Sequence, residues 1–186
     1  LHSVKLIIDI GNTAVKVALF KGKQLQNTII FDKCTLQNIL DFVNKHDISG
    51  TIISSVKDLN ADIKKLIHHF DALLLDFKTL LPIIIDYKTP DTLGKDRIAA
   101  VVGASVLFPK QDVLVFDAGT CLTIDFITKE KIYKGGRISP GIAMRYKALH
   151  QFAEQLPLGN YSAENVLMGY DTESSIISGV QQGILS

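Results

Sequence analysis

The stretch Leu6-Ile7-Ile8-Asp9-Ile10-Gly11-Asn12-Thr13 decides the fold, because a second stretch, Leu114-Val115-Phe116-Asp117-Ala118-Gly119-Thr120, repeats its pattern. Each is an apolar run that ends in Asp-x-Gly with a threonine close behind. Each leads into a second apolar segment, Val15 to Phe20 or Leu122 to Ile127. This pattern is typical of a strand, a tight turn and another strand. The sequence therefore predicts the same hairpin twice, with a carboxylate at the end of each first strand.

The paired turns suit a nucleotide phosphate held between two lobes. Glycine allows the backbone to approach closely and to take positive φ, and backbone N–H groups can face phosphate oxygens. Asp9 and Asp117 can hold a hydrated cation that offsets the phosphate charge. Asp-x-Gly between two strands is also an ordinary hairpin turn. A duplicated half-domain accounts for both copies together, whereas the hairpin interpretation treats each copy separately.

Composition restricts the functional class. The 186-residue chain is 47% hydrophobic and 21% charged, which indicates a globular protein of one or two domains. A net charge of +1 gives no electrostatic reason to expect nucleic acid or a membrane as partner. The two cysteines form no C-x-x-C motif, and the apolar run at Leu6 is too short for a signal peptide. No segment is long enough to span a bilayer, so we expect a cytoplasmic protein.

Alternating strand and helix periodicities predict mixed α/β layers in two lobes, residues 1–110 and 111–186. Thr35 is expected to cap a helix, and a buried helix over 96–108 should stop at Pro109. We expect strands over residues 51–56, 72–76 and 83–87. The chain stops inside an apolar helical pattern, so the second lobe is expected to be incomplete. The two turns should face each other across a cleft.

Three further segments carry polar groups suited to chemistry. In Gly94-Lys95-Asp96-Arg97, Asp96 either caps the following helix or accepts a hydroxyl proton, and Arg97 can present a fork to a carboxylate. The glycine-rich segment 135–141 predicts an anion-facing or substrate-facing loop, or simply a loop before a helix. Thr172 opens another helix, either as its cap or as a contact to a substrate hydroxyl. The scattered histidines predict no transition-metal site.

Taken in order, these motifs resemble those of type III pantothenate kinase, the first enzyme of coenzyme A biosynthesis. They are Asp9-Ile-Gly-Asn-Thr-Ala-Val-Lys16, Gly94-Lys-Asp-Arg97, Asp117-Ala-Gly-Thr120, Gly135-Gly-Arg-Ile-Ser-Pro-Gly141 and Leu156-Pro157. The resemblance spans nearly the whole chain. It implies the actin-like/hexokinase-like ATPase fold, in which two ribonuclease-H-like lobes enclose a nucleotide cleft, usually within a homodimer. The chain departs from the family pattern at Cys121 and Ala153, and neither departure removes a proposed chemical group.

The resemblance also implies a role for each motif. ATP, with Mg²⁺ and a monovalent cation such as potassium or ammonium, would phosphorylate pantothenate, with Asp96 as the general base. The ATP-binding residues would be Asp9, Ile10, Gly11, Asn12, Thr13, Ala14, Val15, Lys16 and Thr120. Asp117 would bind the monovalent cation. The pantothenate contacts would be Tyr87, Gly94, Lys95, Asp96, Arg97 and Thr172.

Two other functional classes stay open at this point. A non-catalytic or regulatory homologue would keep the fold and the phosphate loops, but it would have less reason to keep Asp96 and Arg97 together. An actin-like ATPase would hydrolyse ATP without pantothenate. Turnover of ATP that depends on pantothenate would distinguish the kinase from both.

Overall fold

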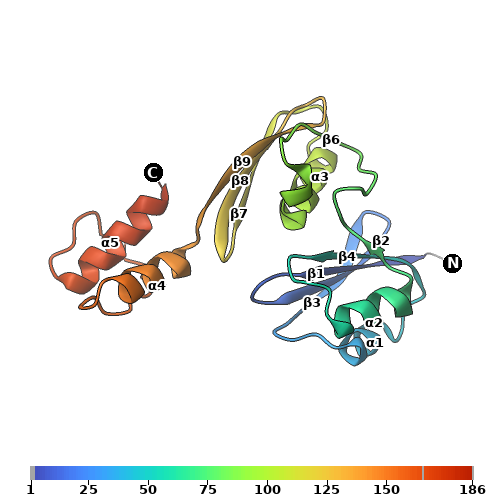
Figure 1. The fold of residues 1–186 in the computed structure, drawn as a ribbon, viewed down its shortest axis with the longest axis horizontal. Coiled ribbons are helices and arrows are strands. Elements are labelled where there is room, and N and C mark those ends of the chain that lie inside the picture. Colours follow the sequence, from blue (N-terminus) through green and yellow to red (C-terminus); the bar gives the residue numbers. More distant parts are fainter. Residues whose placement is uncertain (1–2, 165, 186) are drawn as a thin grey trace.

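A computed structural model describes residues 3–164 and 166–185, and its strands form two sheets (Figure 1). The first sheet has the strand order β3-β2-β1-β4-β5. Its strands are β1 (Val4–Ile10), β2 (Val15–Lys21), β3 (Gln24–Phe31), β4 (Ile48–Ser55) and β5 (Leu73–Leu74). β1 pairs antiparallel with β2 and parallel with β4. Alternate residues of β1 and β2 are buried, as the period of two in a strand requires.

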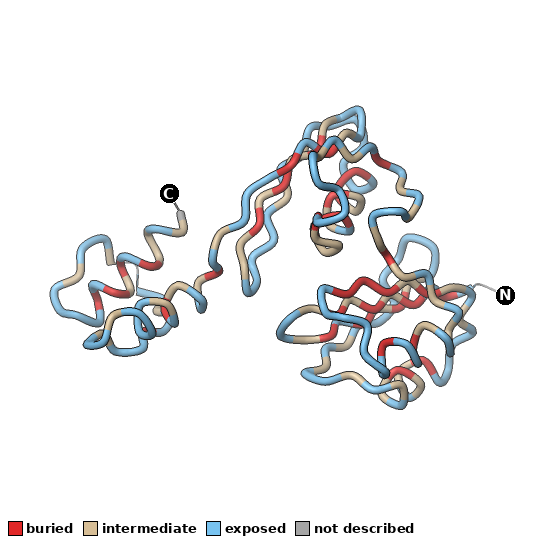
Figure 2. The backbone as a smooth tube through the Cα atoms, in the orientation of Figure 1, coloured by how far each residue is buried: buried red, intermediate tan, exposed pale blue. Residues whose placement is uncertain are grey.

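Two helices pack on this sheet, α1 (Leu36–Val43) and α2 (Ala61–Phe70). The expected cap of α1 is confirmed, because the Thr35 hydroxyl accepts a hydrogen bond from the backbone N–H of Asn38. In α2 the N-cap is Asn60, whose side chain accepts a hydrogen bond from the backbone N–H of Ile63. Figure 2 shows that the buried residues of this lobe lie mainly along the sheet strands. The strand expected over 72–76 is limited to the two residues of β5.

The second sheet has the order β6-β9-β8-β7. Its strands are β6 (Ile84–Ile85), β7 (Val113–Ala118), β8 (Cys121–Ile127) and β9 (Ile132–Pro140), and helix α3 (Lys95–Leu107) follows the short 3₁₀ helix Pro90–Thr92. α3 packs against β7 and β8 around a core that includes Ile98, Val101 and Ile127. Since β6 and α3 both pack with this second sheet, the chain changes sheet earlier than residue 110.

The segment 135–141, expected to be a loop, is instead largely the end of strand β9. β9 pairs with β8 as far as Pro140, which lies opposite Cys121. Proline is tolerated here because this end of β9 pairs with β8 alone, β6 being paired only at Ile132 and Tyr133, so Pro140 lies on an edge. Gly141 then begins the next helix without a side-chain cap.

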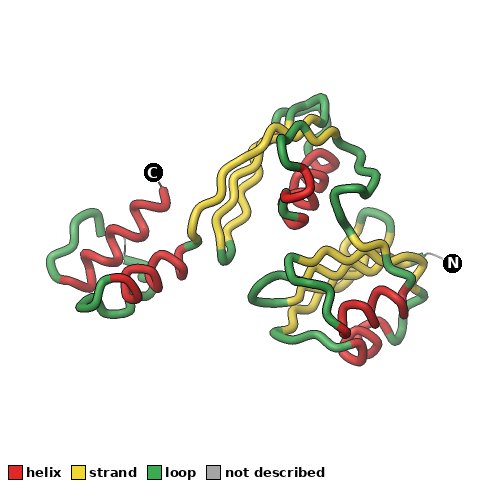
Figure 3. The backbone as a smooth tube through the Cα atoms, in the orientation of Figure 1, coloured by secondary structure: helices red, strands yellow, loops and turns green. Residues whose placement is uncertain are grey.

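Helices α4 (Ile142–Phe152) and α5 (Thr172–Leu185) form a pair at the far end of β9, well separated from the first sheet (Figure 3). They bury a small cluster formed by Tyr146, Ile176 and Val180. A cavity of about 1390 Å³ opens between the two helices. Within the described ranges, no helix is both long and apolar enough to cross a membrane.

Candidate active site

The two Asp-x-Gly turns meet in space, as the sequence predicts. In the first turn the Gly11 N–H donates to the Ala14 carbonyl at 3.0 Å, and in the second the Gly119 N–H donates to the Cys121 carbonyl at 2.8 Å. The hydroxyl oxygens of Thr13 and Thr120 lie 3.0 Å apart and share a hydrogen bond. The turns of the two sheets therefore lie tip to tip.

Neither glycine of these turns takes positive φ, and only Gly11 is closely enclosed. Neither is among the glycines with positive φ, which are Gly22 and Gly135 in the described residues. A Cβ on Gly11 would lie 3.2 Å from the Ala14 carbonyl oxygen, closer than most such contacts. The expected positive φ is thus wrong, and close approach of this backbone to a phosphate stays a prediction.

The residues expected to form the first phosphate loop divide into two groups. Ile10 and Val15 point into the core, so only their backbone is available to a ligand. Asn12 and Thr13 are exposed at the tip of the turn. Lys16, also exposed, lies opposite Asp9 in the β1–β2 ladder. Polar side chains of this loop therefore surround its tip while its apolar residues anchor it.

Asp9, at the first turn, is repelled by two other carboxylates, Asp96 and Asp117. Burial raises the pKa of Asp9 above its ordinary value of 3.8, and repulsion from Asp96 and Asp117 acts in the same direction. Ser54 and Lys16 oppose this rise. The three acids come from β1, α3 and β7, so only the tertiary structure brings them together. Among the described residues, no three metal-ligating side chains form a closed site.

Helix α3 carries Asp96 in its first turn. Gly94 is the N-cap residue, so the alternative in which Asp96 is the N-cap is wrong. The Asp96 Oδ1 atom accepts a hydrogen bond from the Arg97 backbone N–H at 2.8 Å. A Cβ on Gly94 would lie 2.5 Å from that same oxygen, so only glycine leaves room for this carboxylate. Lys95 Nζ donates to the Ser55 carbonyl at 3.1 Å, which ties α3 to the end of β4.

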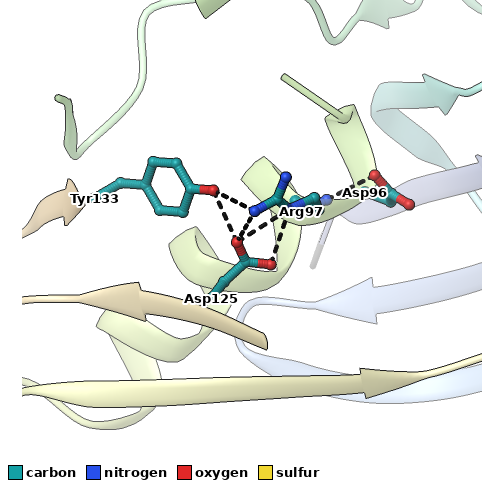
Figure 4. Close-up of polar contacts among 4 residues, drawn as sticks. All are labelled: Asp96, Arg97, Asp125 and Tyr133. Atoms are coloured by element: carbon teal, nitrogen blue, oxygen red, sulfur yellow. Dashed lines mark hydrogen bonds and ion pairs between the residues drawn. The ribbon is translucent and has the colours of Figure 1, made fainter. Parts of the chain in front are cut away.

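Arg97 directs its side chain into a buried polar cluster, on the side opposite the Asp96 carboxylate (Figure 4). Its Nε donates to both carboxylate oxygens of Asp125 at 3.0 and 3.1 Å, and its Nη2 donates to Asp125 Oδ1 at 2.6 Å. Nη2 also donates to the Tyr133 hydroxyl at 2.9 Å, which in turn donates to Asp125 Oδ1 at 2.7 Å. The Arg97 guanidinium, expected to bind a substrate carboxylate, instead binds the Asp125 carboxylate of the same chain.

Charge and burial are balanced within this cluster. Burial alone would lower the pKa of Arg97, but hydrogen bonding and attraction from Asp125 raise it, so the guanidinium stays charged. Burial raises the pKa of Tyr133, and hydrogen bonding to Asp125 adds to that rise. Removing one partner of a buried ion pair costs about 3–5 kcal/mol, because the other charge is left without compensation.

Sequence reasoning missed Asp125 and Tyr133. A signal was present: Thr123, Asp125 and Ile127 alternate along β8, and all three are buried. An acid on the buried phase of a strand indicates an internal partner. Tyr87, an expected substrate contact, lies beside this cluster with its ring 5.9 Å from that of Tyr133, and its hydroxyl interacts with Arg97.

Thr172 and Asp117 occupy different surroundings. Asp117 is exposed at the end of β7, beside the second turn. Thr172 begins α5 and lines the cavity between α4 and α5, and Figure 1 shows that helix pair far from α3. The Asp171 carboxylate accepts from the Ser174 N–H at 2.7 Å, so Asp171 rather than Thr172 caps α5. A single copy of the chain does not bring Thr172 to Asp96.

Solved structures share this two-lobed arrangement. A provisionally named Baf family transcriptional activator from Campylobacter jejuni matches with a TM-score of 0.56 and 22% identity, covering 97% of this chain and 75% of that one. A provisionally named 2-dehydro-3-deoxygalactonokinase from Sinorhizobium meliloti matches with a TM-score of 0.58 and 11% identity, covering 97% and 80%. At these identities the likeness shows the fold alone. The fold is that of the actin-like ATPases, the class that includes many small-molecule kinases.

Sequence comparison specifies the family within that class. The type III pantothenate kinase family profile matches residues 5–186. Type III pantothenate kinases from Bacteroides fragilis and Cytophaga hutchinsonii are 46% and 44% identical to this chain, each over 97% of it and over 75% and 76% of their own length. The chain belongs to the type III pantothenate kinase family. Its members phosphorylate pantothenate with ATP, the first step of coenzyme A biosynthesis.

Proposed function

We propose that this chain transfers the γ-phosphoryl group of ATP to the primary hydroxyl of pantothenate, with Asp96 as the general base. The observation that carries this assignment is the contact between the facing turns at Thr13 and Thr120, because Asp9 and Asp117 precede those turns in the chain and Asp96 adds to the rise in the Asp9 pKa. Phosphoryl transfer asks a protein mainly for positioning and charge neutralisation. Phosphoryl transfer to a hydroxyl also needs a proton acceptor. Asp96 at the start of α3 can serve as that acceptor, while Asp9 and Asp117 can hold cations.

The nucleotide side of the site is assigned to the two turns. We assign the phosphate contacts to backbone N–H groups at the tip of the first turn and to the exposed side chains of Asn12, Thr13 and Thr120. Asp9 suits Mg²⁺, since Mg²⁺ usually takes one or two carboxylates and completes its shell with water and phosphate. Bound there, Mg²⁺ would neutralise charge on the transferring group. The absence of a closed metal site among the described residues is consistent with this arrangement.

The pantothenate side is assigned to the residues around the start of α3. Gly94 and Lys95 directly precede Asp96, the proposed base, and Tyr87 lies beside its neighbour Arg97, so these three are the proposed contacts that one chain supplies. Thr172 would reach the same substrate only from a second copy or after a rearrangement, because α5 lies apart from α3. We also propose a homodimer in the cytoplasm, with Asp117 as ligand of a monovalent cation, potassium or ammonium.

A coupled assay of ATP turnover with and without pantothenate tests this function. We expect turnover to require pantothenate, and we expect Asp96→Asn to lower kcat by about 100-fold or more, the loss typical of a missing general base. Binding of Mg-ATP, measured by calorimetry, should persist in that variant. The matched control is Asp91→Asn, which alters an exposed acid close by in the chain and should keep wild-type turnover.

Two results would contradict the proposal separately. Turnover that proceeds equally without pantothenate would make the chain an ATPase. Near-normal kcat in Asp96→Asn would leave the kinase activity in place and reject Asp96 as its base.

A further inference from the structure

The most buried polar cluster of the second lobe takes no part in the reaction described above. Arg97, Asp125 and Tyr133 are 5%, 1% and 0% exposed. They come from α3, β8 and β9, so the cluster joins one helix to two strands of the sheet beneath it (Figure 4). Its members are mutually hydrogen-bonded, and nothing in the proposed chemistry requires their charge.

We propose that Asp125 and Tyr133 are positioning residues that hold Arg97, and through Arg97 fix the first turn of α3 that presents Asp96. The inference rests on the proposed role of Asp96 as base. It assigns to Asp125 and Tyr133 a function in the reaction although neither faces the turns. It also gives Arg97 a task that differs from direct recognition of the pantothenate carboxylate.

The connection between Arg97 and Asp96 is short and direct. The two residues are neighbours in the chain, and the Asp96 carboxylate accepts its hydrogen bond from the Arg97 backbone N–H. Any displacement of Arg97 therefore moves the donor that orients this carboxylate. A shift of about 1 Å in a reacting group can cost 100-fold in rate.

The start of α3 depends on such anchors because it lacks an ordinary cap. Gly94 offers no side-chain hydrogen bond to the helix N-terminus. Two side chains of the first turn reach outward instead: Lys95 to the Ser55 carbonyl and Arg97 to Asp125. Beyond them the helix is held by apolar contacts of Ile98 and Val101, which have no directional preference. The Arg97 fork is thus the directional contact between this turn and the second sheet.

The strand beneath the cluster is shaped around Asp125. A Cβ on Gly136 of β9 would lie 2.1 Å from the Ile124 carbonyl oxygen and 2.6 Å from Asp125 Oδ1. Since Asp125 and Gly136 are ladder partners, β9 passes close over this carboxylate. The acid is held by backbone on one side and by the Tyr133 hydroxyl on another, so it presents a rigid acceptor to the guanidinium.

The experiment uses Tyr133→Phe, which removes one hydroxyl and keeps the buried ring. We expect kcat to fall about 10-fold, the scale of a small misplacement of a reacting group, while the KM for ATP changes less than about twofold. The matched control is Tyr146→Phe, which removes the hydroxyl of a buried tyrosine that donates a part-buried hydrogen bond to Gln181 between α4 and α5. The control should lower the melting temperature by a similar amount and leave kcat unchanged, which separates positioning from general stability.

A second comparison tests whether the effect passes through Arg97. Arg97→Lys keeps the charge but loses the two-pronged geometry, so kcat should fall. If Tyr133 acts through Arg97, the double variant Tyr133→Phe/Arg97→Lys should be no slower than Arg97→Lys alone. If Arg97→Lys does not fold, the comparison of Tyr133→Phe with Tyr146→Phe decides the matter.

Three results would overturn the inference: an unchanged kcat in Tyr133→Phe, a loss of rate no larger than in the control, or an effect confined to the KM for pantothenate. An effect confined to the KM for pantothenate would indicate that Arg97 binds the substrate directly. Asp96→Asn distinguishes these failures from a failure of the proposed function. If it abolishes turnover while Tyr133→Phe does not, the base assignment stands and only the positioning role is lost.

Discussion

Thr13 and Thr120, 107 residues apart in the chain, share a hydrogen bond of 3.0 Å between their hydroxyl oxygens. One belongs to the turn between β1 and β2, and the other to the turn between β7 and β8. Both hydroxyls are exposed, so each can exchange this bond for one to a phosphate oxygen. The pair therefore marks the point at which the two halves of the site contact each other.

The first prediction concerns these hydroxyls. Thr120→Val should raise the KM for ATP about 10-fold or more, because a hydrogen bond to a charged phosphate contributes about 1.5–3 kcal/mol. Thr13→Val should act in the same direction. Steady-state kinetics at saturating pantothenate measure both effects. Thr28→Val, which removes a hydroxyl that bonds to the Val17 carbonyl in the first sheet, should leave this KM unchanged. A wild-type KM for ATP in both Thr120→Val and Thr13→Val would show that these hydroxyls do not contact ATP.

The second prediction follows from the raised pKa of Asp9. The folded protein holds the Asp9 proton more tightly than the unfolded chain, so stability falls as the pH rises from 3.8 through the higher folded pKa. Above that range the ionised carboxylate destabilises the ligand-free protein. Asp9→Asn should therefore raise the melting temperature at pH 7 and reduce the further rise that Mg-ATP produces.

Thermal unfolding with and without Mg-ATP measures both parts of this second prediction. The rise in melting temperature caused by Asp9→Asn should disappear near pH 3, where the wild-type carboxyl is protonated in the folded protein. Asp91→Asn, at an exposed position, serves as the control. A variant that is less stable at pH 7 yet still responds fully to Mg-ATP would contradict the assigned burial and the assigned metal contact.

The third prediction tests the space reserved beside Asp96. In Gly94→Ala the new methyl group would lie 2.5 Å from Asp96 Oδ1, so the carboxylate must move. Because the displaced atom is the end of a side chain, we expect little loss of stability, but kcat should fall about 10-fold or more. Melting temperature and kcat are compared with those of Gly103→Ala, at a glycine of α3 with open space around it. Wild-type kcat in Gly94→Ala would show that the observed carboxylate position is not the reactive one.

The fourth prediction concerns the monovalent cation. Replacing potassium by sodium at constant ionic strength should lower the rate, since a large cation accepts a loose shell of carboxylate, carbonyl and hydroxyl oxygens such as the end of β7 can offer. Asp117→Asn should weaken the response to potassium while keeping the fold, because Asp117 is exposed. A rate that is the same in both salts would remove the monovalent site without affecting the kinase assignment.

The repeated hairpin was readable from the sequence because strand periodicity and turn chemistry are local properties. The apolar runs ending at Asp9 and Asp117 form β1 and β7, and their turns meet as expected. The helix before Pro109 and the Thr35 cap are also correct for the same reason, although the helix is buried on one face only and its end at Val106 and Leu107 is exposed. Each depends on residues within about two helical turns of one another, where spacing alone determines which groups meet.

Other features depended on contacts that spacing does not specify. The glycine-rich segment 135–141 resembles a loop in isolation, but pairing with β8 makes it a strand. The two-residue strand β6 joins the second sheet only because β9 lies beside it. Ladder hydrogen bonds to a neighbouring strand, whether adjacent in the chain like β8 or distant like β9 from β6, outweigh weak local preferences for loop or strand.

Arg97 shows most clearly which features the sequence determines and which depend on tertiary structure. The sequence by itself determined that an acid and an arginine open a buried helix, and it thereby located the proposed base and the family. Only the tertiary structure decided where the guanidinium points, because its partners Asp125 and Tyr133 lie on strands far along the chain. A charge that folding buries takes whichever acceptor the packed elements bring within reach, since an unpaired charge in the interior is too costly to keep.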